Sequence, residues 1–190
     1  AQDRLDRAGL AARADLRLQD YRDLPAAGDA PFDAIVSIEM FEAVGREYWH
    51  GYFQTLKRCL APHGRACIQT ITVRDDLFER YARSTDFIQQ YVFPGGMLPS
   101  PAAFRAAARE AGLVIENELA FGGDYAHTLR LWRQRFLEQL PQVRAQGFDT
   151  RFVRLWEFYL AYCEAAFETG STDVLQFTLR HADAAPPPRS

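Results

Sequence analysis

The stretch Phe32–Gly45, FDAIVSIEMFEAVG, joins an apolar run to two closely spaced carboxylates. The run Phe32–Ile38 is dense in apolar and β-branched residues, a pattern typical of a strand buried on both faces of a parallel sheet. Glu39 follows the run directly, and Glu42 lies one short turn later. Because ligands bind beyond the carboxyl ends of strands in open α/β sheets, we predict that both carboxylates lie at a functional site. The structural alternative is that they open the next helix, where a carboxylate suits the positive end of the helix dipole.

Composition and charge are those of an ordinary globular protein. The 190 residues suffice for one domain with a substantial core, and 48% of them are hydrophobic and 25% charged. A net charge of −3 argues against a general nucleic-acid binder. No apolar run approaches the length of a membrane span and no signal peptide is visible, so we expect a cytoplasmic protein. Cys59, Cys67 and Cys163 form no CxxC pair, which indicates free thiols and no metal site.

The rest of the chain alternates between helical and strand patterns. We expect helices over residues 1–9, 46–60, 101–111, 126–140 and 151–168, and strands over residues 14–19, 32–38, 66–73, 113–119 and 173–179. Pro62–Gly64 is expected to end the second helix, whose inward face would include Tyr48. This order predicts an α/β fold with a mixed sheet, in which the late alternating strand runs antiparallel near one edge.

Residues 74–101 are expected to form a long irregular connection that contains YVFPGGMLPSP. A connection of this length inside a compact domain is usually a functional lid or a binding loop. The pair Gly95–Gly96 allows backbone conformations that are closed to other residues. We treat residues 1–181 as one domain, with a loop over residues 25–31, and residues 182–190, which hold three consecutive prolines, as a disordered tail.

Five motifs occur together and in a fixed order: LQDYRDL, FDAIVSIEMFEAVG, YVFPGGMLPS, HTLRLWRQRF and WEFYLAYCEAAF. Together they resemble the cyclopropane-fatty-acyl-phospholipid synthase family, which includes the enzymes that modify mycolic acids. The resemblance covers nearly all of the chain except the proline-rich tail. It implies the Rossmann-like sheet of class I methyltransferases, with an inserted helical lid, and S-adenosylmethionine as the cofactor.

The resemblance implies transfer of a methyl carbon from S-adenosylmethionine to the double bond of an unsaturated phospholipid acyl chain. The alkene attacks the sulfonium methyl, a carbocation forms on the acyl chain, and bound bicarbonate removes a proton as the cyclopropane ring closes. Aromatic faces and carboxylates stabilise such cations. A simple lipid C-methyltransferase would look much the same. Such a substrate implies peripheral, transient contact with a membrane, with the apolar lid around Tyr91–Leu98 admitting the acyl chain. The oligomeric state is left open between a monomer and a homodimer.

By motif match, the resemblance assigns the catalytic bicarbonate site to Glu42, Gln69, Ile71 and Tyr159. Bicarbonate can donate its hydroxyl to a carboxylate while it accepts from an amide, a backbone N–H and a phenol. Many family members carry His where this chain has Gln69, which can donate a hydrogen bond but cannot change protonation state near neutral pH. From periodicity alone, Tyr159 would be a core aromatic in an amphipathic helix.

The resemblance also assigns cofactor contacts to Gln19, Asp20, Tyr21 and Glu39, with Asp20 accepting from the adenine amino group. The structural alternative for Asp20 is an aspartate that ends a strand in a turn. Class I methyltransferases carry a glycine-rich loop after their first strand, but no G-x-G occurs in this sequence. We therefore expect the carboxyl-terminal part of an enzyme, without the first two strands, which would lie between the segments 14–19 and 32–38. The non-enzymatic alternative is an inactive remnant, or a binding module that docks on a catalytic partner.

Overall fold

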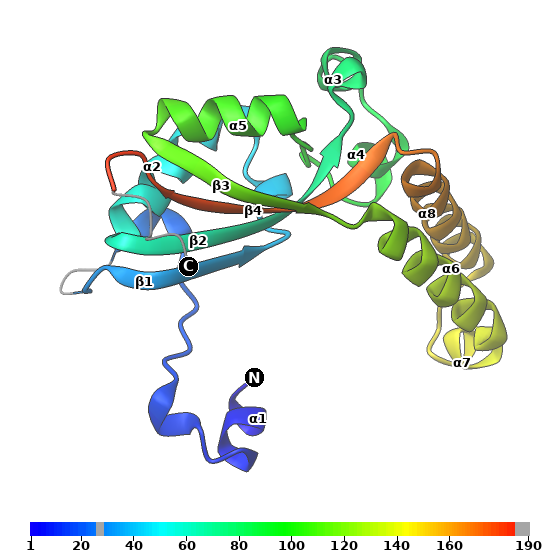
Figure 1. Cartoon of the computed structure of the whole chain (residues 1–190). Helices are drawn as coiled ribbons and strands as arrows, with labels where there is room; N and C mark the ends of the chain where they lie inside the picture. Colours follow the sequence, from blue (N-terminus) through cyan, green and yellow to red (C-terminus); the bar gives the residue numbers. More distant parts are fainter. Residues whose placement is uncertain (26–28, 185–190) are drawn as a thin grey trace.

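The fold is a mixed four-stranded sheet with helices on one face and a helical extension at one end (Figure 1). The computed structural model describes residues 1–25 and 29–184. The strands lie in the order β1, β2, β4, β3, and their bounds are Phe32–Ile38 (β1), Leu60–Val73 (β2), Leu113–Ala120 (β3) and Thr172–His181 (β4). β1 and β2 run parallel, whereas β4 runs antiparallel to both β2 and β3. The predicted mixed α/β sheet, with a late antiparallel strand near one edge, is confirmed.

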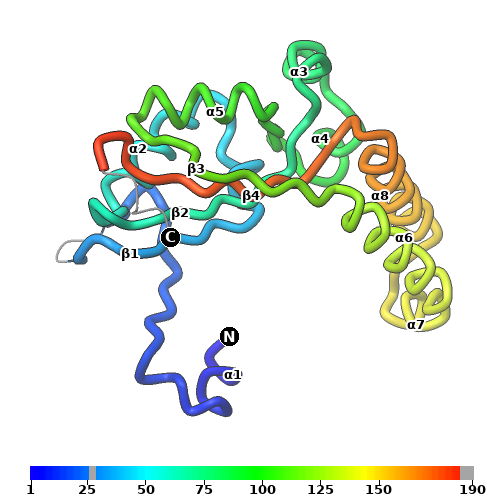
Figure 2. Tube along the Cα trace, in the orientation of Figure 1, coloured from blue at the N-terminus to red at the C-terminus, as the bar shows by residue number. Residues whose placement is uncertain are grey.

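The helices divide into two groups. Those described are α1 (Gln2–Arg7), α2 (Trp49–Cys59), α3 (Asp75–Ala82), α4 (Phe87–Tyr91), α5 (Pro101–Glu110), α6 (Gly122–Glu138), α7 (Leu140–Ala145) and α8 (Thr150–Glu168). Helices α2 and α5 cover one face of the sheet, and α6, α7 and α8 lie together beyond one end of it (Figures 1 and 2). No helix in the described ranges is long and apolar enough to cross a membrane.

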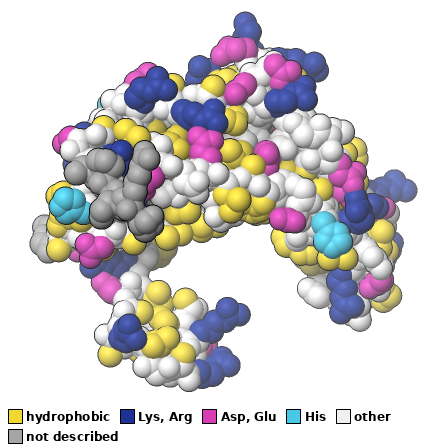
Figure 3. All heavy atoms as spheres, in the orientation of Figure 1, with side chains coloured by type: hydrophobic (Ala, Val, Ile, Leu, Met, Phe, Trp, Pro, Cys, Tyr) yellow, Lys and Arg dark blue, Asp and Glu magenta, His cyan; other side chains and the backbone are white. Residues whose placement is uncertain are grey.

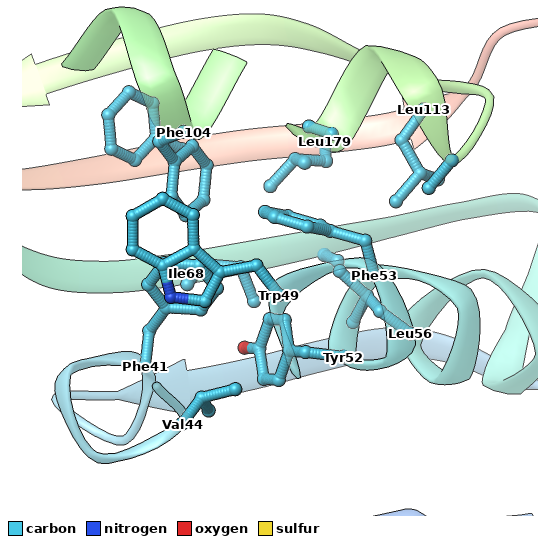
Figure 4. Close-up of a cluster of buried hydrophobic side chains, with 14 of the residues drawn as sticks. Phe41, Val44, Trp49, Tyr52, Phe53, Leu56, Ile68, Phe104, Leu113 and Leu179 are labelled. Carbon is cyan, nitrogen blue, oxygen red and sulfur yellow. The ribbon is translucent and has the colours of Figure 1, made fainter. Parts of the chain in front are cut away.

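An aromatic core fills the space between the sheet and helices α2 and α5 (Figure 4). Phe41 packs against Phe53 and Phe104, with ring centroids 5.5 and 5.2 Å away, and Phe104 stacks on Phe177 at 4.1 Å. Truncation of one such buried ring to alanine typically costs about 3–5 kcal/mol of stability. Phe41 begins the short 3-10 turn Phe41–Ala43 that follows β1. The core therefore anchors the turn that carries Glu42.

The predicted strand over residues 14–19 is wrong. The backbone of these residues is extended up to the 3-10 turn Tyr21–Asp23, but it pairs with no strand of the described chain. Leu16 and Leu18 are exposed, and Figure 1 shows the segment leading away from the sheet toward α1. A strand needs a neighbour that pairs its N–H and C=O groups, and a local sequence pattern does not supply one. The predicted first helix is confirmed as α1.

The predicted strand 32–38 forms as β1, but the expectation that it is buried on both faces is wrong. Val36 and Ile38 are 68% and 53% exposed, because helices α2 and α5 cover only the opposite face. β1 also lies at the edge of the sheet, where it pairs with β2 alone among the described strands. Figure 3 shows a band of hydrophobic side chains along this side of the sheet.

Residues 74–101 were expected to be irregular, but they contain the short helices α3 and α4. Helix α4 begins with a capping box in which Asp86 accepts from the backbone N–H of Gln89, while the side chain of Gln89 accepts from the backbone N–H of Asp86. This reciprocal pair satisfies two donors at the helix start and stabilises a helix too short to form alone. The connection is therefore ordered by local hydrogen bonds.

The helix predicted over residues 46–60 begins at Trp49, after a 3-10 turn that leaves Tyr48 exposed rather than on the inward face. Pro62–Gly64 does not end this helix but lies inside β2, which starts at Leu60.

Helix α6 begins earlier than expected, at Gly122, and Pro141 lies in the first turn of α7, where proline needs no hydrogen-bond donor. The predicted loop 25–31 and tail 182–190 lie partly outside the described residues.

Candidate active site

A cavity of about 910 Å³ lies where the carboxyl ends of β1 and β2 meet helices α3, α4 and α8. The predicted site residues Glu39, Glu42, Ile71 and Tyr159 line it together. The rest of the wall is largely apolar and includes most of the lid segment, which we define as Tyr91–Leu98. Two carboxylates at the carboxyl end of a parallel edge strand, facing an apolar cavity, form the arrangement expected of a reactive site in an open α/β fold.

The lid segment is hydrogen-bonded to the turn after β1. The backbone N–H of Met97 donates to the carbonyl oxygen of Glu42 over 2.8 Å. The side chain of Gln89, in α4, donates to the carbonyl oxygen of Gly96 over 2.9 Å. One wall of the cavity is thus attached directly to the residue that carries its buried carboxylate.

Glu42 is the carboxylate that the fold buries most completely at this site. Its Oε1 accepts a hydrogen bond of 2.6 Å from the backbone N–H of Ile71, whereas its Oε2 is buried and has no partner among the described residues. Burial raises the pKa of Glu42 above its ordinary value, and the hydrogen bond from Ile71 opposes this only in part. A buried oxygen without a partner at a cavity wall fits a ligand that can donate a hydrogen bond.

Ile71 contributes its backbone to this arrangement in a particular way. Its N–H, predicted as a donor to bicarbonate, is already directed at Glu42 Oε1. In this geometry Ile71 orients the carboxylate, while its side chain forms part of the cavity wall. The hydrogen bond from Ile71 to Glu42 is possible because β1 and β2 are parallel neighbours and end at the same edge of the sheet.

Glu39 is held by a chain of hydrogen bonds from three other elements. Its Oε1 accepts from Gln69 Nε2 over 2.8 Å and from the hydroxyl of Tyr125 in α6. Gln176 Nε2, in β4, donates to Gln69 Oε1 over 2.9 Å, which fixes the orientation of the Gln69 amide toward Glu39. Glu39 also has a φ of 52°, a left-handed conformation that is uncommon for residues other than glycine. Several hydrogen bonds therefore hold an unusual backbone position at the cavity wall.

Gln69 accordingly lies beside Glu39 and does not line the cavity with Glu42, Ile71 and Tyr159. Its predicted contact with bicarbonate stays a prediction. Tyr125 and Gln176 were not predicted as site residues. Tyr125 lies just before the HTLRLWRQRF motif, which was the one signal in the sequence that could have pointed to it.

Tyr159 projects from α8, packs against other aromatic rings and lines the cavity. It therefore has features of a core aromatic and of a site residue at once. Its ring lies 5.0 Å from Trp156 and 6.3 Å from Phe93 of the lid segment, the latter edge to face. Burial, with smaller contributions from Cys163 and Glu39, raises the pKa of Tyr159 to about 12. Its hydroxyl is therefore protonated at neutral pH and available as a hydrogen-bond donor.

The predicted adenine contacts lie apart from this cavity. Both carboxylate oxygens of Asp20 accept from Arg22, and these hydrogen bonds lower the pKa of Asp20 to about 2. Gln19 donates to the backbone oxygen of Asp23 over 3.3 Å. Asp20 thus caps a 3-10 turn, although no strand precedes it, and its predicted role toward adenine stays a prediction.

Tyr21 is the member of this segment that lines a cavity. The space has a volume of about 340 Å³ and is bounded by β1 and α2, with Ile38 and Met40 in its wall. Tyr21 packs edge to face on Tyr52, with ring centroids 5.6 Å apart, and Tyr52 donates to the hydroxyl of Ser37 over 3.0 Å. This smaller cavity offers an aromatic and apolar surface on the other side of the β1 carboxyl end from Glu42.

Comparison with known proteins shows which family the chain is related to. The sequence profile of the mycolic acid cyclopropane synthetase family matches residues 1–177. The chain belongs to this family. It is 41% identical over 180 residues to tuberculostearic acid methyltransferase UfaA1 of Mycobacterium tuberculosis, which covers 94% of the chain and 41% of that protein. It is 38% identical over 160 residues to cyclopropane-fatty-acyl-phospholipid synthase of Escherichia coli, covering 84% and 39%.

Solved structures of mycolic acid cyclopropane synthases have the same fold. CmaA1, complexed with SAH and CTAB, superposes with a TM-score of 0.74 at 27% identity and covers 94% of this chain and 67% of that chain. MmaA2 from Mycobacterium tuberculosis gives a TM-score of 0.74 at 23% identity, covering 92% and 66%. The class I methyltransferase fold predicted for this family member is thereby confirmed. The chain spans about two fifths of the length of the two curated relatives named above.

Proposed function

We propose that the protein to which this chain belongs transfers a methyl carbon from S-adenosylmethionine to the double bond of an unsaturated phospholipid acyl chain, and so forms a cyclopropane ring. The observation that carries the proposal is Glu42, whose buried and partly unpartnered carboxylate faces a large apolar cavity. An apolar cavity suits an acyl chain, and a buried carboxylate with a free oxygen in its wall marks a place of chemistry.

The residues of the cavity also suit a cationic reaction course. In the proposed reaction the alkene carbons form a new bond to the methyl carbon while the carbon–sulfur bond breaks, which leaves positive charge on the acyl chain. The aromatic rings of Phe93, Tyr159 and Tyr162 line the cavity and can face this charge. The carboxyl group of Glu39, fixed by Gln69 and Tyr125, lies at the same wall.

Glu42 and Tyr159 fit the bicarbonate that the family resemblance implies. Glu42 Oε2 lacks the donor that a bicarbonate hydroxyl would provide, and the protonated Tyr159 hydroxyl can donate to an anion. When bound, bicarbonate supplies the base that accepts a proton from the transferred carbon. The chain's own part is to orient this anion, with Ile71 holding Glu42 in place, and to exclude water from the apolar cavity.

The described residues fit S-adenosylmethionine only in part. Tyr21 and the smaller cavity offer an aromatic surface for an adenine ring, and Glu39 ends the strand that lines this cavity. The sequence has no G-x-G for the methionine part of the cofactor. We therefore assign the adenine side to this segment as a proposal and derive no step from cofactor binding. When bound, the cofactor supplies the electrophilic methyl carbon.

A second candidate function is methyl transfer without ring closure. It is favoured by the 41% identity to a relative named as a tuberculostearic acid methyltransferase. The first bond formation is shared by both reactions, and they differ in the carbon that then loses a proton. Loss from the transferred carbon closes the ring, whereas loss from a neighbouring chain carbon leaves a methyl-substituted alkene.

The proposed substrate lies in a membrane, and we propose peripheral contact with its surface through the lid segment. Tyr91 and Phe93 of the lid are both more than half exposed although they are aromatic. Sedimentation with phospholipid vesicles tests this contact: Phe93→Asp should reduce the bound fraction, and Phe148→Asp, at an exposed phenylalanine of the α7–α8 connection, serves as the control. Equal binding of all three proteins would place the contact elsewhere.

The experiment for the main proposal uses the full-length protein, unsaturated phospholipid vesicles and S-adenosylmethionine with a fully deuterated methyl group. Mass spectrometry of the acyl chains reads the product. A cyclopropane retains two deuterium atoms of the transferred group and a methyl-substituted chain retains three. Incorporation of label supports lipid methyl transfer, and the deuterium count decides between the two candidates. Absence of label in lipid, with the cofactor shown to bind, would overturn the proposal.

A further inference from the structure

Arg80 lies on the stripe of α3 that faces the large cavity. Leu77, Arg80, Tyr81 and Ser84 all line it, and their spacing of three and four residues places them along one face of the helix and its end. The opposite side of α3 enters the core through Phe78, which is 5% exposed. Arg80 is itself exposed, so this cation lies where the cavity opens to solvent.

The other arginines around α3 have partners, and Arg80 has none within the described residues. Arg74 forms an ion pair with Asp76 at 2.6 Å, and Arg83 approaches Glu79 at 4.0 Å. The guanidinium of Arg46 lies over the ring of Phe78, 5.2 Å from its centroid. Figure 3 shows this mixture of basic and acidic side chains crowded at the surface over α3.

Three carboxylates also line the cavity, and none of them forms an ion pair with Arg80 among the described residues. Asp86 accepts from the backbone N–H of Gln89 over 2.9 Å and from the Tyr162 hydroxyl over 3.4 Å. Glu39 accepts from two side chains, and Glu42 is held by a backbone N–H. Among the described residues that line the cavity, Arg80 is therefore the one cationic side chain, and it has no acidic partner there.

We propose that Arg80 binds the anionic headgroup of the amphiphile whose acyl chain occupies the cavity. The inference rests on the proposed function for the acyl chain and adds the class of headgroup. An apolar cavity with one cation at its opening is complementary to a long hydrocarbon chain that ends in one negative group. A guanidinium donates paired hydrogen bonds to a phosphate or to a carboxylate, which are the two anions that such amphiphiles carry.

The test uses monomeric single-chain probes, titrated calorimetrically into the full-length protein below their micelle concentrations. Dodecyl phosphate and dodecanoate carry the anion, dodecyltrimethylammonium carries a cation, and dodecyl maltoside is neutral. Arg80→Ala should weaken binding of the better anionic probe by about twofold to fivefold and leave the neutral probe unchanged. The cationic probe should bind to the variant at least as well as to the parent protein. Arg83→Ala removes the same charge from α3 outside the cavity wall and is the matched control.

The outcomes separate the headgroup site from the acyl cavity. Loss of anion binding in Arg80→Ala but not in Arg83→Ala supports the site, and the anion that binds the parent more tightly identifies the headgroup. Equal affinities of the parent and Arg80→Ala for both anions, or equal losses in the two variants, would overturn the inference while the neutral probe still reports the acyl cavity. Failure of every probe to bind would overturn the cavity assignment with it. The titrations could give the expected pattern while the transfer assay shows no label in lipid. That combination would support the headgroup site and refute the proposed reaction.

Discussion

The backbone N–H of Ile71 donates to Glu42 Oε1 at 2.6 Å, and this contact joins the ends of two parallel strands. It leaves the second carboxylate oxygen of Glu42 buried at the cavity wall without a partner in the described chain. The position of the carboxylate is thus set by the backbone of the sheet and not by a mobile side chain.

Replacement of Glu42 by glutamine should lower turnover by about 10²–10⁴-fold, the usual contribution of a group that positions a base. The amide oxygen can still accept from Ile71, so the fold is expected to persist. Steady-state kinetics with lipid vesicles, together with circular dichroism, measure the two effects. Glu47→Gln, at an exposed glutamate of the next turn, is the control. Full turnover in Glu42→Gln would move the site to Glu39.

The same substitution should change the pH dependence of stability. Because burial raises the pKa of Glu42 in the folded state, the folding preference for its neutral form is present at low pH and is lost as pH rises through the folded pKa. Glu42→Gln removes this loss. Urea unfolding should therefore show the variant gaining stability relative to the parent as pH rises from 4 to 8, a range set by carboxyl pKa values raised above about 4.3. A difference that is constant over this range would contradict the burial of the carboxylate.

Tyr159→Phe should reduce turnover by about tenfold, because one hydrogen-bond donor is lost while the ring still packs on Trp156 and Phe93. The pKa of Tyr159 is about 12, so its hydroxyl stays protonated and should add no inflection to the rate profile below pH 9. Rates measured across this range check both statements. Bicarbonate added to the assay should restore part of the lost rate if the hydroxyl contributes to anion affinity, and no response would argue for packing alone.

Tyr125→Phe should destabilise the fold by about 0.5–1.5 kcal/mol, because it removes a donor from the Glu39 carboxylate. A double-mutant cycle with Glu39→Gln isolates the interaction, and we expect a coupling free energy of about 0.5–3 kcal/mol from urea unfolding. Tyr52→Phe removes a hydroxyl that is bonded to Ser37 and should show no coupling to Glu39. Additive effects of Tyr125→Phe and Glu39→Gln would mean that the hydrogen bond contributes nothing.

Glu164 should stabilise the packing of α6 on α8 in a pH-dependent way. It is 7% exposed, and its two oxygens accept from Arg130 at 2.9 Å and Arg133 at 3.0 Å. Desolvation raises the pKa of Glu164, but the hydrogen bonds from the two arginines outweigh it and lower the pKa overall. Its stabilisation is therefore full above the pKa of the unfolded chain, about 4.3, and is lost as pH falls through the lower folded value. Glu164→Gln should lower the free energy of unfolding at pH 7 and matter less toward pH 3, whereas an equal effect at both would refute the ion pairs.

The sequence predicted the parts of the site that depend on local pattern. The apolar run 32–38 predicted β1, and its end placed Glu39 and Glu42 at the edge of the sheet where the cavity lies. Tyr159 was reached only through the family resemblance, because helical periodicity does not distinguish a core ring from one that lines a cavity.

What the sequence missed depends on distant partners. Tyr125 bonds to Glu39 across 86 positions and Gln176 bonds to Gln69 across 107, so no local pattern connects them. The wrong prediction for residues 14–19 also comes from a missing distant partner. These residues were predicted to form a strand, but a strand needs a paired neighbour, and none of the described strands pairs with them.

The hydrogen bond from Met97 to the carbonyl oxygen of Glu42 links the lid segment of the cavity to the turn that carries the carboxylate. Breaking this bond would free one end of the lid segment, whereas the bond from Ile71 would still hold the carboxylate. A change in the lid segment can therefore reach Glu42 through the backbone of its turn, while the carboxylate keeps its own separate attachment to the sheet.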